Sequence, residues 1–361
     1  MKKEKEKILG SVGGEALMEG IMMRGPKGAA VSLRLSNGTI ETTLTDAKLP
    51  KDKFKILGWP LIRGPVNLVH SMISGYKYLM QSAEKMTEGM MDEAEESTSK
   101  LDQWIEKHMG PKMMTVIGVI GSVLGVALAM GLFVFAPEYL ISLIERFAGK
   151  IDPRFIALVS GGIRVVLFVL YMLVMSYIKD IRRVFQYHGA EHKTIFCYEA
   201  GLDLTVENVR KQSRLHPRCG TSFMFLMILL SICVSGIVYA IFPGLAEITI
   251  VRVGLKFLQF PIIMAFGYEF IRFAGQHLEN PIVRAISFPG LCMQRITTKE
   301  PDDSMIEVGI AALNAAVGNV VIEDLPTPEI DATPEIEGTD TIAGDIDTTS
   351  DGERAGEADG Q

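Results

Sequence analysis

The chain has 361 residues, 48% of them hydrophobic, and a formal net charge of −7. Its mean hydropathy of +0.25 is high for a soluble protein, and the excess falls in a few long runs, which argues against a soluble globular enzyme. The four cysteines are too few to indicate a disulfide framework.

Residues 1–64 are expected to form a β-rich subdomain. Residues 28–45, GAAVSLRLSNGTIETTLT, alternate in character around Asn37-Gly38, which predicts a β-hairpin with a type I′ turn. The preceding GGEALMEGIMMRGP contains four glycines and a proline, so we expect one short strand and loops there.

The same glycine-rich segment has two readings. In the first, which we favour, Glu19 and Arg24 form an ion pair inside the β-layer. In the second, the segment is a loop over a downstream histidine-bearing helix, and it supplies Glu19 or Arg24 to an anionic substrate.

Residues 65–112 are expected to be helical and charged. Pro65 suits the first turn of a helix, and apolar residues then recur on one face. The helix is too polar to span a membrane, so we expect it to lie along the membrane surface or against the spans.

Four apolar runs follow, at 113–135, 155–178, 221–242 and 252–274. Each is long enough to cross a hydrocarbon core of about 30 Å, which takes roughly 20 helical residues. The alternative is a set of buried core helices, but four such runs with basic flanks are typical of membrane proteins. We therefore expect a mainly α, integral membrane fold, with helices 1 and 2 in 113–178 and helices 3 and 4 in 221–274. A short amphipathic outer helix is expected at 137–149.

The connection 179–220 is strongly basic and predicts the orientation. It contains eight lysines and arginines, whereas the turn at 243–251 contains none. By the positive-inside rule, this connection and both termini face the cytosol, in a bacterial plasma membrane. The bilayer is the partner this implies. No nucleic-acid partner is expected, and a homo-oligomer is left open.

The second span is predicted to continue without a break into the connection and to carry His188-Gly-Ala-Glu191-His192. Histidines four apart share one helix face, so both rings can reach one cation. Glu191 could accept a proton from metal-bound water, as in inverted zinc-protease motifs. The alternative is that both histidines are ordinary polar residues at a solvated helix end.

Two further polar clusters lie at the same membrane face. RLHPRCGTSF offers His216 and Cys219 immediately before the third span, and either could complete a site with His188 and His192. The predicted cofactor is a divalent metal, most plausibly zinc. Where the fourth span emerges, a group of polar residues could contact substrate: Glu269, His277 and Glu279.

The C-terminal part is divided in two. Residues 275–318 form a segment with one amphipathic helix at 301–317. Residues 319–361 contain 13 acidic residues and one arginine, so the other 318 residues carry a net charge near +5. This tail has no apolar periodicity, and we expect it to be disordered.

Four motifs together resemble the YqhQ family of bacterial multi-pass membrane proteins (domain of unknown function 1385). They are GGEALMEGIMMRGP, YHGAEHKTIFCYE, HPRCGTSF and FPGLCMQRITTKEPDDSMIEVGIAAL, and they cover roughly residues 10–320. The chain departs from the family pattern at Glu15, where glutamine is frequent. The resemblance implies a metal-dependent membrane enzyme with no assigned reaction.

Three functions are therefore compared. The first is a membrane-bound, metal-dependent hydrolase with Glu191 as base, which needs an open coordination position. The second is an assembly or accessory protein, whose His/Cys cluster is a closed structural metal site or binds no metal. The third is a transporter, in which Arg164 inside the second span marks a polar cavity. We rank them in that order.

Overall fold

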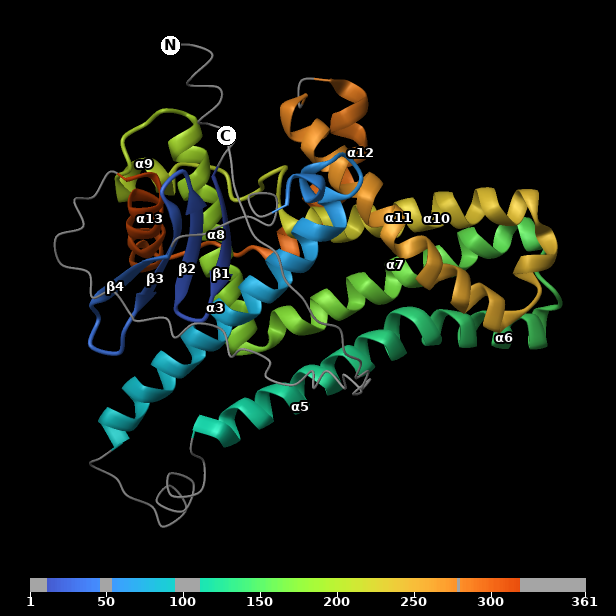
Figure 1. Ribbon diagram of the computed structural model, residues 1–361, viewed down its shortest axis with the longest axis horizontal. Coiled ribbons are helices and arrows are strands. Elements are labelled where there is room, and N and C mark those ends of the chain that lie inside the picture. Colours follow the sequence, from blue (N-terminus) through green and yellow to red (C-terminus); the bar gives the residue numbers. More distant parts are fainter. Residues whose placement is uncertain (1–11, 46–53, 95–110, 278–279, 319–361) are drawn as a thin grey trace, which may run out of the picture. The chain divides into compact units, whose positions relative to one another are not determined.

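The computed structural model describes residues 12–45, 54–94, 111–277 and 280–318, and the chain is mainly helical with one sheet near its N-terminus (Figure 1). Four helical segments are long and apolar enough to cross a membrane, as the four runs predict. The acidic tail at 319–361 and the stretch 95–110 lie outside the described residues.

The N-terminal strands form a four-stranded antiparallel meander in the order of the sequence. The prediction of one strand before the hairpin was wrong, because two strands form there. The glycines in this segment lie within the strands and do not break them. Gly14 allows the sheet to approach the helix that carries Glu191, because a Cβ at this position would lie 2.9 Å from Glu191 Cγ. The strands are β1 (Gly13–Leu17), β2 (Gly20–Gly25), β3 (Gly28–Arg34) and β4 (Ile40–Thr45).

The hairpin between β3 and β4 is confirmed, but its turn is not type I′. That turn requires a positive φ at both central residues, and of the pair only Gly38 has one, at +83°. The Gly38 amide donates to the Leu35 carbonyl, and the Leu35 amide donates to Thr39. This is a three-residue loop whose last residue is a left-handed glycine.

Helices cover both faces of the sheet. On one face, Ile21, Met23 and Ala30 pack against α8 (Lys179–Glu199) and α13 (Asp303–Val317). On the other face, Met22 and Val31 pack against Tyr78 of α3 (Arg63–Ala94). Met22 and Met23 lie on opposite faces because successive side chains of a strand point to opposite sides of the sheet. The N-terminal sheet, the central connection and the last helix therefore share one hydrophobic core.

The first span is longer than predicted. Helix α5 (Pro111–Met130) passes through the π-helical segment η2 (Gly131–Phe135) into α6 (Ala136–Ala148) without a break. The helix expected at 137–149 is confirmed as α6, but its continuity with the first span was not predicted. Pro137 is tolerated because it lies in the first turn of α6, directly after the π-helical turn.

The other spans pack side by side. Helix α10 runs along both α7 and α11, and α3 packs against α11 (Figure 1). The three spans are α7 (Pro153–Tyr177), α10 (Gly220–Ile241) and α11 (Thr249–Gln276).

The second span does not continue into the histidine-bearing helix. Ile178 is extended, with φ −69° and ψ 126°, and it separates α7 from α8. The prediction of one unbroken helix was wrong because no proline marks the break. The apolar run ends here and charged residues begin, so α8 leaves the direction of α7 and packs on the sheet.

Several short elements and one longer helix complete the chain. Helix α12 (Pro281–Thr297) was not predicted, since Pro289 lies in its interior and masks the helical pattern. It packs against α10 and α7, and its last turn reaches the connection before α10. The short elements are η1 (Lys55–Gly58), α9 (Val206–Arg210) and η3 (Pro243–Ala246).

Candidate metal centre

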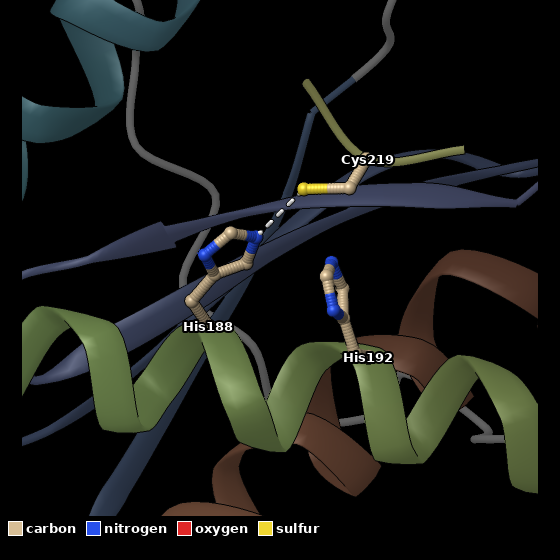
Figure 2. A group of neighbouring side chains, drawn as sticks. All are labelled: His188, His192 and Cys219. Carbon is tan, nitrogen blue, oxygen red and sulfur yellow. Dashed lines mark hydrogen bonds between the residues drawn. The ribbon is translucent and has the colours of Figure 1, made fainter. Parts of the chain in front are cut away.

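His188, His192 and Cys219 converge at one point. Figure 2 shows both rings projecting from α8 toward the cysteine. The ring centroids are 4.4 Å apart, and His188 Nε2 lies 3.2 Å from Cys219 Sγ. One ligand atom from each of the three residues lies within 4.8 Å of the others. Of the two partners considered for the histidine pair, Cys219 is the one that joins this three-residue group.

In each of the two histidine rings, Nδ1 is hydrogen-bonded to a backbone carbonyl. His188 Nδ1 donates to Thr297 O at 2.9 Å, and His192 Nδ1 donates to Arg214 O at 2.6 Å. A proton on Nδ1 leaves the lone pair on Nε2, so both Nε2 atoms can act as metal ligands. The carbonyls thus fix both the tautomer and the orientation of each ring.

The HPRCG connection is fixed by α12. Gln294 is fully buried, and its amide accepts from the His216 amide at 2.7 Å and donates to the His216 carbonyl at 2.6 Å. It also donates to Ser222 in the first turn of α10 at 2.7 Å. Cys219 is the N-cap of α10, where the helix dipole favours negative charge. Sequence reasoning missed Gln294, because a single glutamine in a C-terminal segment carries no recognisable signal.

His216 lies beside the group without belonging to it. Its ring centroid is 5.6 Å from that of His192 and 4.6 Å from that of Phe196. Nδ1 accepts from the Arg218 amide at 3.3 Å, and Nε2 lies 3.5 Å from Glu199 Oε2, so both ring nitrogens have partners. Burial lowers the pKa of His216 to about 4, which keeps it neutral at physiological pH.

His192 is also kept neutral. It is 2% exposed, and burial lowers its pKa. Cys219 and the Arg214 carbonyl act in the opposite direction, but burial is the larger effect. A neutral imidazole is the form that ligates metals.

Glu191 is buried against the sheet, where it accepts from the Gly14 amide and acts electrostatically on Glu15. Burial raises the pKa of Glu191, while His188, His216 and the Gly14 amide lower it by smaller amounts. Burial also raises the pKa of Glu15, from 4.5 to about 7, and the neighbouring Glu191 adds to this shift. The charge of Glu191 therefore makes Glu15 harder to ionise. Sequence reasoning singled out Glu15 only as a departure from the family pattern.

Glu19 and Arg24 do not pair with each other. Glu19 binds Arg183, with Oε2 2.5 Å from Arg183 Nη2, and it accepts from Tyr187 Oη at 3.1 Å. The expected ion pair was therefore wrong, because positive φ at Glu19 turns it toward α8. Arg24 lies near Glu15, whose pKa it lowers, and its buried Nε has no hydrogen-bond partner among the described residues.

The other candidate substrate residues lie outside the three-residue group. Glu269 pairs with Arg63 of α3, at 2.5 Å between Oε2 and Nη2. His277 is exposed, bonds to the Phe273 carbonyl of its own helix and stacks on the Phe273 ring. Glu279 lies outside the described residues.

A family model described as "Protein of unknown function (DUF1385)" matches residues 59–319, which include the three converging side chains. The chain belongs to this family. It is also 34% identical over 314 residues to the "Uncharacterized protein YqhQ" of Bacillus subtilis (strain 168), covering 86% of this chain and 93% of that protein. No solved structure matches the chain. Membership of this family agrees with the four motifs, and the arguments for chemistry rest on the site itself.

Proposed function

We propose that this protein is a metal-dependent hydrolase whose metal centre is formed by His188, His192 and Cys219 at the membrane face. One observation carries the proposal: both Nδ1 atoms are held by carbonyls, so both Nε2 atoms face the cysteine sulfur. Two imidazoles and a thiolate are a donor set that suits zinc.

The number of ligands favours catalysis over a purely structural site. Structural zinc sites have four protein ligands, whereas catalytic sites have three and keep one position open. Here three ligand atoms converge, and both nitrogens of the nearby His216 are bonded elsewhere. A bound zinc ion would lower the pKa of a coordinated water to about 7.

Glu191 is the proposed general base. It lies on the same helix as both histidines, within electrostatic reach of His188. Its raised pKa brings a carboxylate closer to the range in which it can exchange a proton at neutral pH. Burial and the charge of Glu191 raise the pKa of Glu15 to about 7, so a second carboxyl that can exchange protons near neutral pH lies within electrostatic reach of Glu191. The orientation that places this site at the cytosolic face of the plasma membrane is part of the proposal, and it rests on the basic connection 179–220.

The first test is the metal content of the detergent-purified full chain, by elemental mass spectrometry. We expect about one zinc per chain, and less than a tenth of that in His188→Ala, His192→Ala and Cys219→Ser. His277→Ala is the matched control, because this exposed histidine bonds only within its own helix. A metal-free parent protein, or equal metal in the ligand variants, would contradict the proposal.

The second test asks whether Glu191 acts as a general base or as a metal ligand. Glu191→Gln should retain the metal, and the Co²⁺-loaded protein should keep the thiolate charge-transfer band that Cys219→Ser loses. Hydrolysis of a panel of ester, amide and phosphoester substrates should be absent in Glu191→Gln and present in the parent. Loss of metal in Glu191→Gln would make the glutamate a ligand or a support for one.

A structural metal site in an accessory protein is the second candidate. The observation that favours it is the low exposure of His192 and Cys219, 2% and 5%. The metal would then tie α8 to the N-terminus of α10. Four-coordinate Co²⁺ with no exchangeable water, measured by water-proton relaxation, would support this function over hydrolysis.

A further inference from the structure

A cavity of about 320 Å³ lies among the spans, between η2, α7, α10 and α11. Phe257 and Phe260 on its rim are each about half exposed, so the cavity reaches the outer surface of the helices, where lipid chains lie in a bilayer. Three polar residues interrupt the wall: Arg164, Ser231 and Lys256. The rest is apolar and includes Phe133, Val134, Met227, Phe257 and Phe260.

The charges around this cavity do not cancel. Glu138 accepts from Arg252 Nε at 2.7 Å and also pairs with Lys256. Arg164 lies in the same wall as Lys256. These four residues, which we call the membrane charge cluster, comprise three cations and one carboxylate. The excess is about two positive charges.

Arg164 bonds only to neutral acceptors among the described residues. Its guanidinium donates to Phe133 O at 3.1 Å, to Ser231 Oγ at 3.3 Å and to Ser160 Oγ at 3.5 Å. The Phe133 carbonyl lies in the π-helical turn η2, and Pro137, four residues later, has no amide hydrogen to donate to it. Ser160 lies between Arg164 and Glu138, with its hydroxyl 3.2 Å from Glu138 Oε1, so Arg164 reaches the carboxylate only through this bridge. Glu138 pairs directly with the other two cations, and three cations that share one carboxylate are costly inside a membrane, so these residues indicate a missing anion.

A smaller chamber continues the cavity inward. It holds about 10 Å³, room for one water molecule, and shares Arg164, Ser231 and Lys256 with the larger cavity. Tyr239 lines this chamber, is 2% exposed, and its hydroxyl has no hydrogen-bond partner among the described residues. The inner end therefore offers an unpaired hydroxyl beside the two cations Arg164 and Lys256.

The cavity is separate from the metal centre. Arg164 lies 11 residues after the start of α7, about 17 Å along the helix and near the middle of a 30 Å hydrocarbon core. The remaining 13 residues of α7 add about 20 Å before α8 begins. A ligand here could not touch His188 or His192, so this inference does not rest on the proposed function.

We propose that this cavity binds a lipid whose head is a phosphate monoester, with the head at Arg164 and Lys256 and a chain along the apolar wall. A phosphate monoester carries a charge between about −1.5 and −2, which matches the excess of the cluster. Its oxygens accept hydrogen bonds where donors are in surplus. A fatty acid supplies one negative charge, and a zwitterionic phospholipid supplies no net charge.

Native mass spectrometry of the detergent-purified full chain tests this with four probes: phosphatidic acid, oleate, phosphatidylcholine and inorganic phosphate. We expect phosphatidic acid to bind at least tenfold more tightly than oleate or phosphatidylcholine, and inorganic phosphate not to compete at equal concentration. Equal binding of phosphatidic acid and phosphatidylcholine would overturn the proposal. Full competition by inorganic phosphate would show a site for a free anion and would also overturn it.

Variants of residues around the cavity test whether phosphatidic acid binds there. Lys256→Met should weaken phosphatidic acid at least tenfold, and Val134→Trp should do so by filling the cavity. Arg272→Met is the matched control, because Arg272 is an exposed cation near the other end of the same helix, and it should bind like the parent. Equal losses in Lys256→Met and Arg272→Met would contradict the assignment.

Photolabelling of the parent chain tests the proposal without any variant, so it remains informative if a variant fails to fold. Phosphatidic acid with a photoreactive diazirine in its chain should label peptides of η2 and α11 that contain Val134 or Phe260. Labelling restricted to other surfaces of the spans would overturn the proposal.

Discussion

The proposed metal centre and the membrane charge cluster both bury polar side chains, but the first leaves lone pairs unused and the second leaves hydrogen-bond donors unused. At the metal centre, each Nδ1 proton has a carbonyl, and lone pairs of nitrogen and sulfur converge. In the membrane charge cluster, one carboxylate faces three cations, and donors are in surplus. A surplus of lone pairs suits a cation, and a surplus of donors suits an anion. Whether a site has unused lone pairs or unused donors therefore indicates whether its ligand is a cation or an anion.

The two regions also differ in how they are supported. Around the metal centre, Gln294 and the carbonyls of Arg214 and Thr297 fix each side chain. Arg164 instead has three long bonds to neutral groups, of 3.1 to 3.5 Å. We expect the metal centre to be rigid before its ligand binds, and the membrane charge cluster to gain order when its ligand binds.

The largest effect is expected from Glu138→Gln, which removes the only carboxylate that the described part of the cluster contains. Arg252, 1% exposed, and Lys256 would be left without a counter-charge. Breaking a buried ion pair typically costs roughly 3–5 kcal/mol. The apparent melting temperature of detergent-solubilised protein should fall steeply, and phosphatidic acid should restore part of it.

The control for that variant is Glu145→Gln, a partly exposed glutamate on the same helix α6. It should change the melting temperature little. Equal shifts in the two variants would mean that the membrane charge cluster is not stabilised by its ion pairs, and the comparison above would lose its basis.

A smaller loss is expected from Gln294→Ala at the metal centre. It would leave the amide and carbonyl of His216 and the Ser222 hydroxyl unpaired, at about 1 kcal/mol each or about 3 kcal/mol in total. The apparent melting temperature and the bound metal should fall together. Gln294→Glu can accept from the amide but cannot donate, so it should lie between the parent and Gln294→Ala. Unchanged metal in Gln294→Ala would show that the connection keeps its shape without this support.

The smallest effect concerns pH and Glu15. Its pKa is about 7 when folded and about 4.5 when unfolded, so the folded chain holds a proton that the unfolded chain has lost between these values. Stability should therefore fall as pH rises from about 5 to about 7.5. Glu15→Gln cannot ionise and should remove this dependence, a difference on the order of 2 kcal/mol at pH 8. Melting curves from pH 5 to pH 8 measure it, with Glu41→Gln as the control at a partly exposed glutamate of the same sheet. Parallel curves for the parent and Glu15→Gln would contradict the raised pKa of Glu15.

The sequence predicted those parts of the molecule in which a local pattern determines the structure. Four apolar runs, the hairpin around Asn37-Gly38 and the last amphipathic helix correspond to observed elements. The histidine spacing on α8 placed both rings on one face, and Cys219 was among the candidate third ligands.

The remaining features depend on contacts between distant segments, which no local pattern records. Glu191 raises the pKa of Glu15 because β1 packs on α8, and the same packing brings Glu19 to Arg183. Gln294 reaches His216 across 78 residues of sequence. The break at Ile178 follows from where α8 packs, since the residues around it contain neither glycine nor proline.

The shared core of sheet, α8 and α13 has a consequence for biosynthesis. The first strands leave the ribosome early, but of the two helices that cover Ile21, Met23 and Ala30, α8 is made between the second and third spans and α13 after all four. The nascent chain therefore holds an incompletely covered apolar sheet face throughout membrane insertion. Contacts between the two ends of a chain form slowly, and exposed strands in the meantime favour aggregation. We therefore expect the N-terminal sheet to need shielding until α13 is translated.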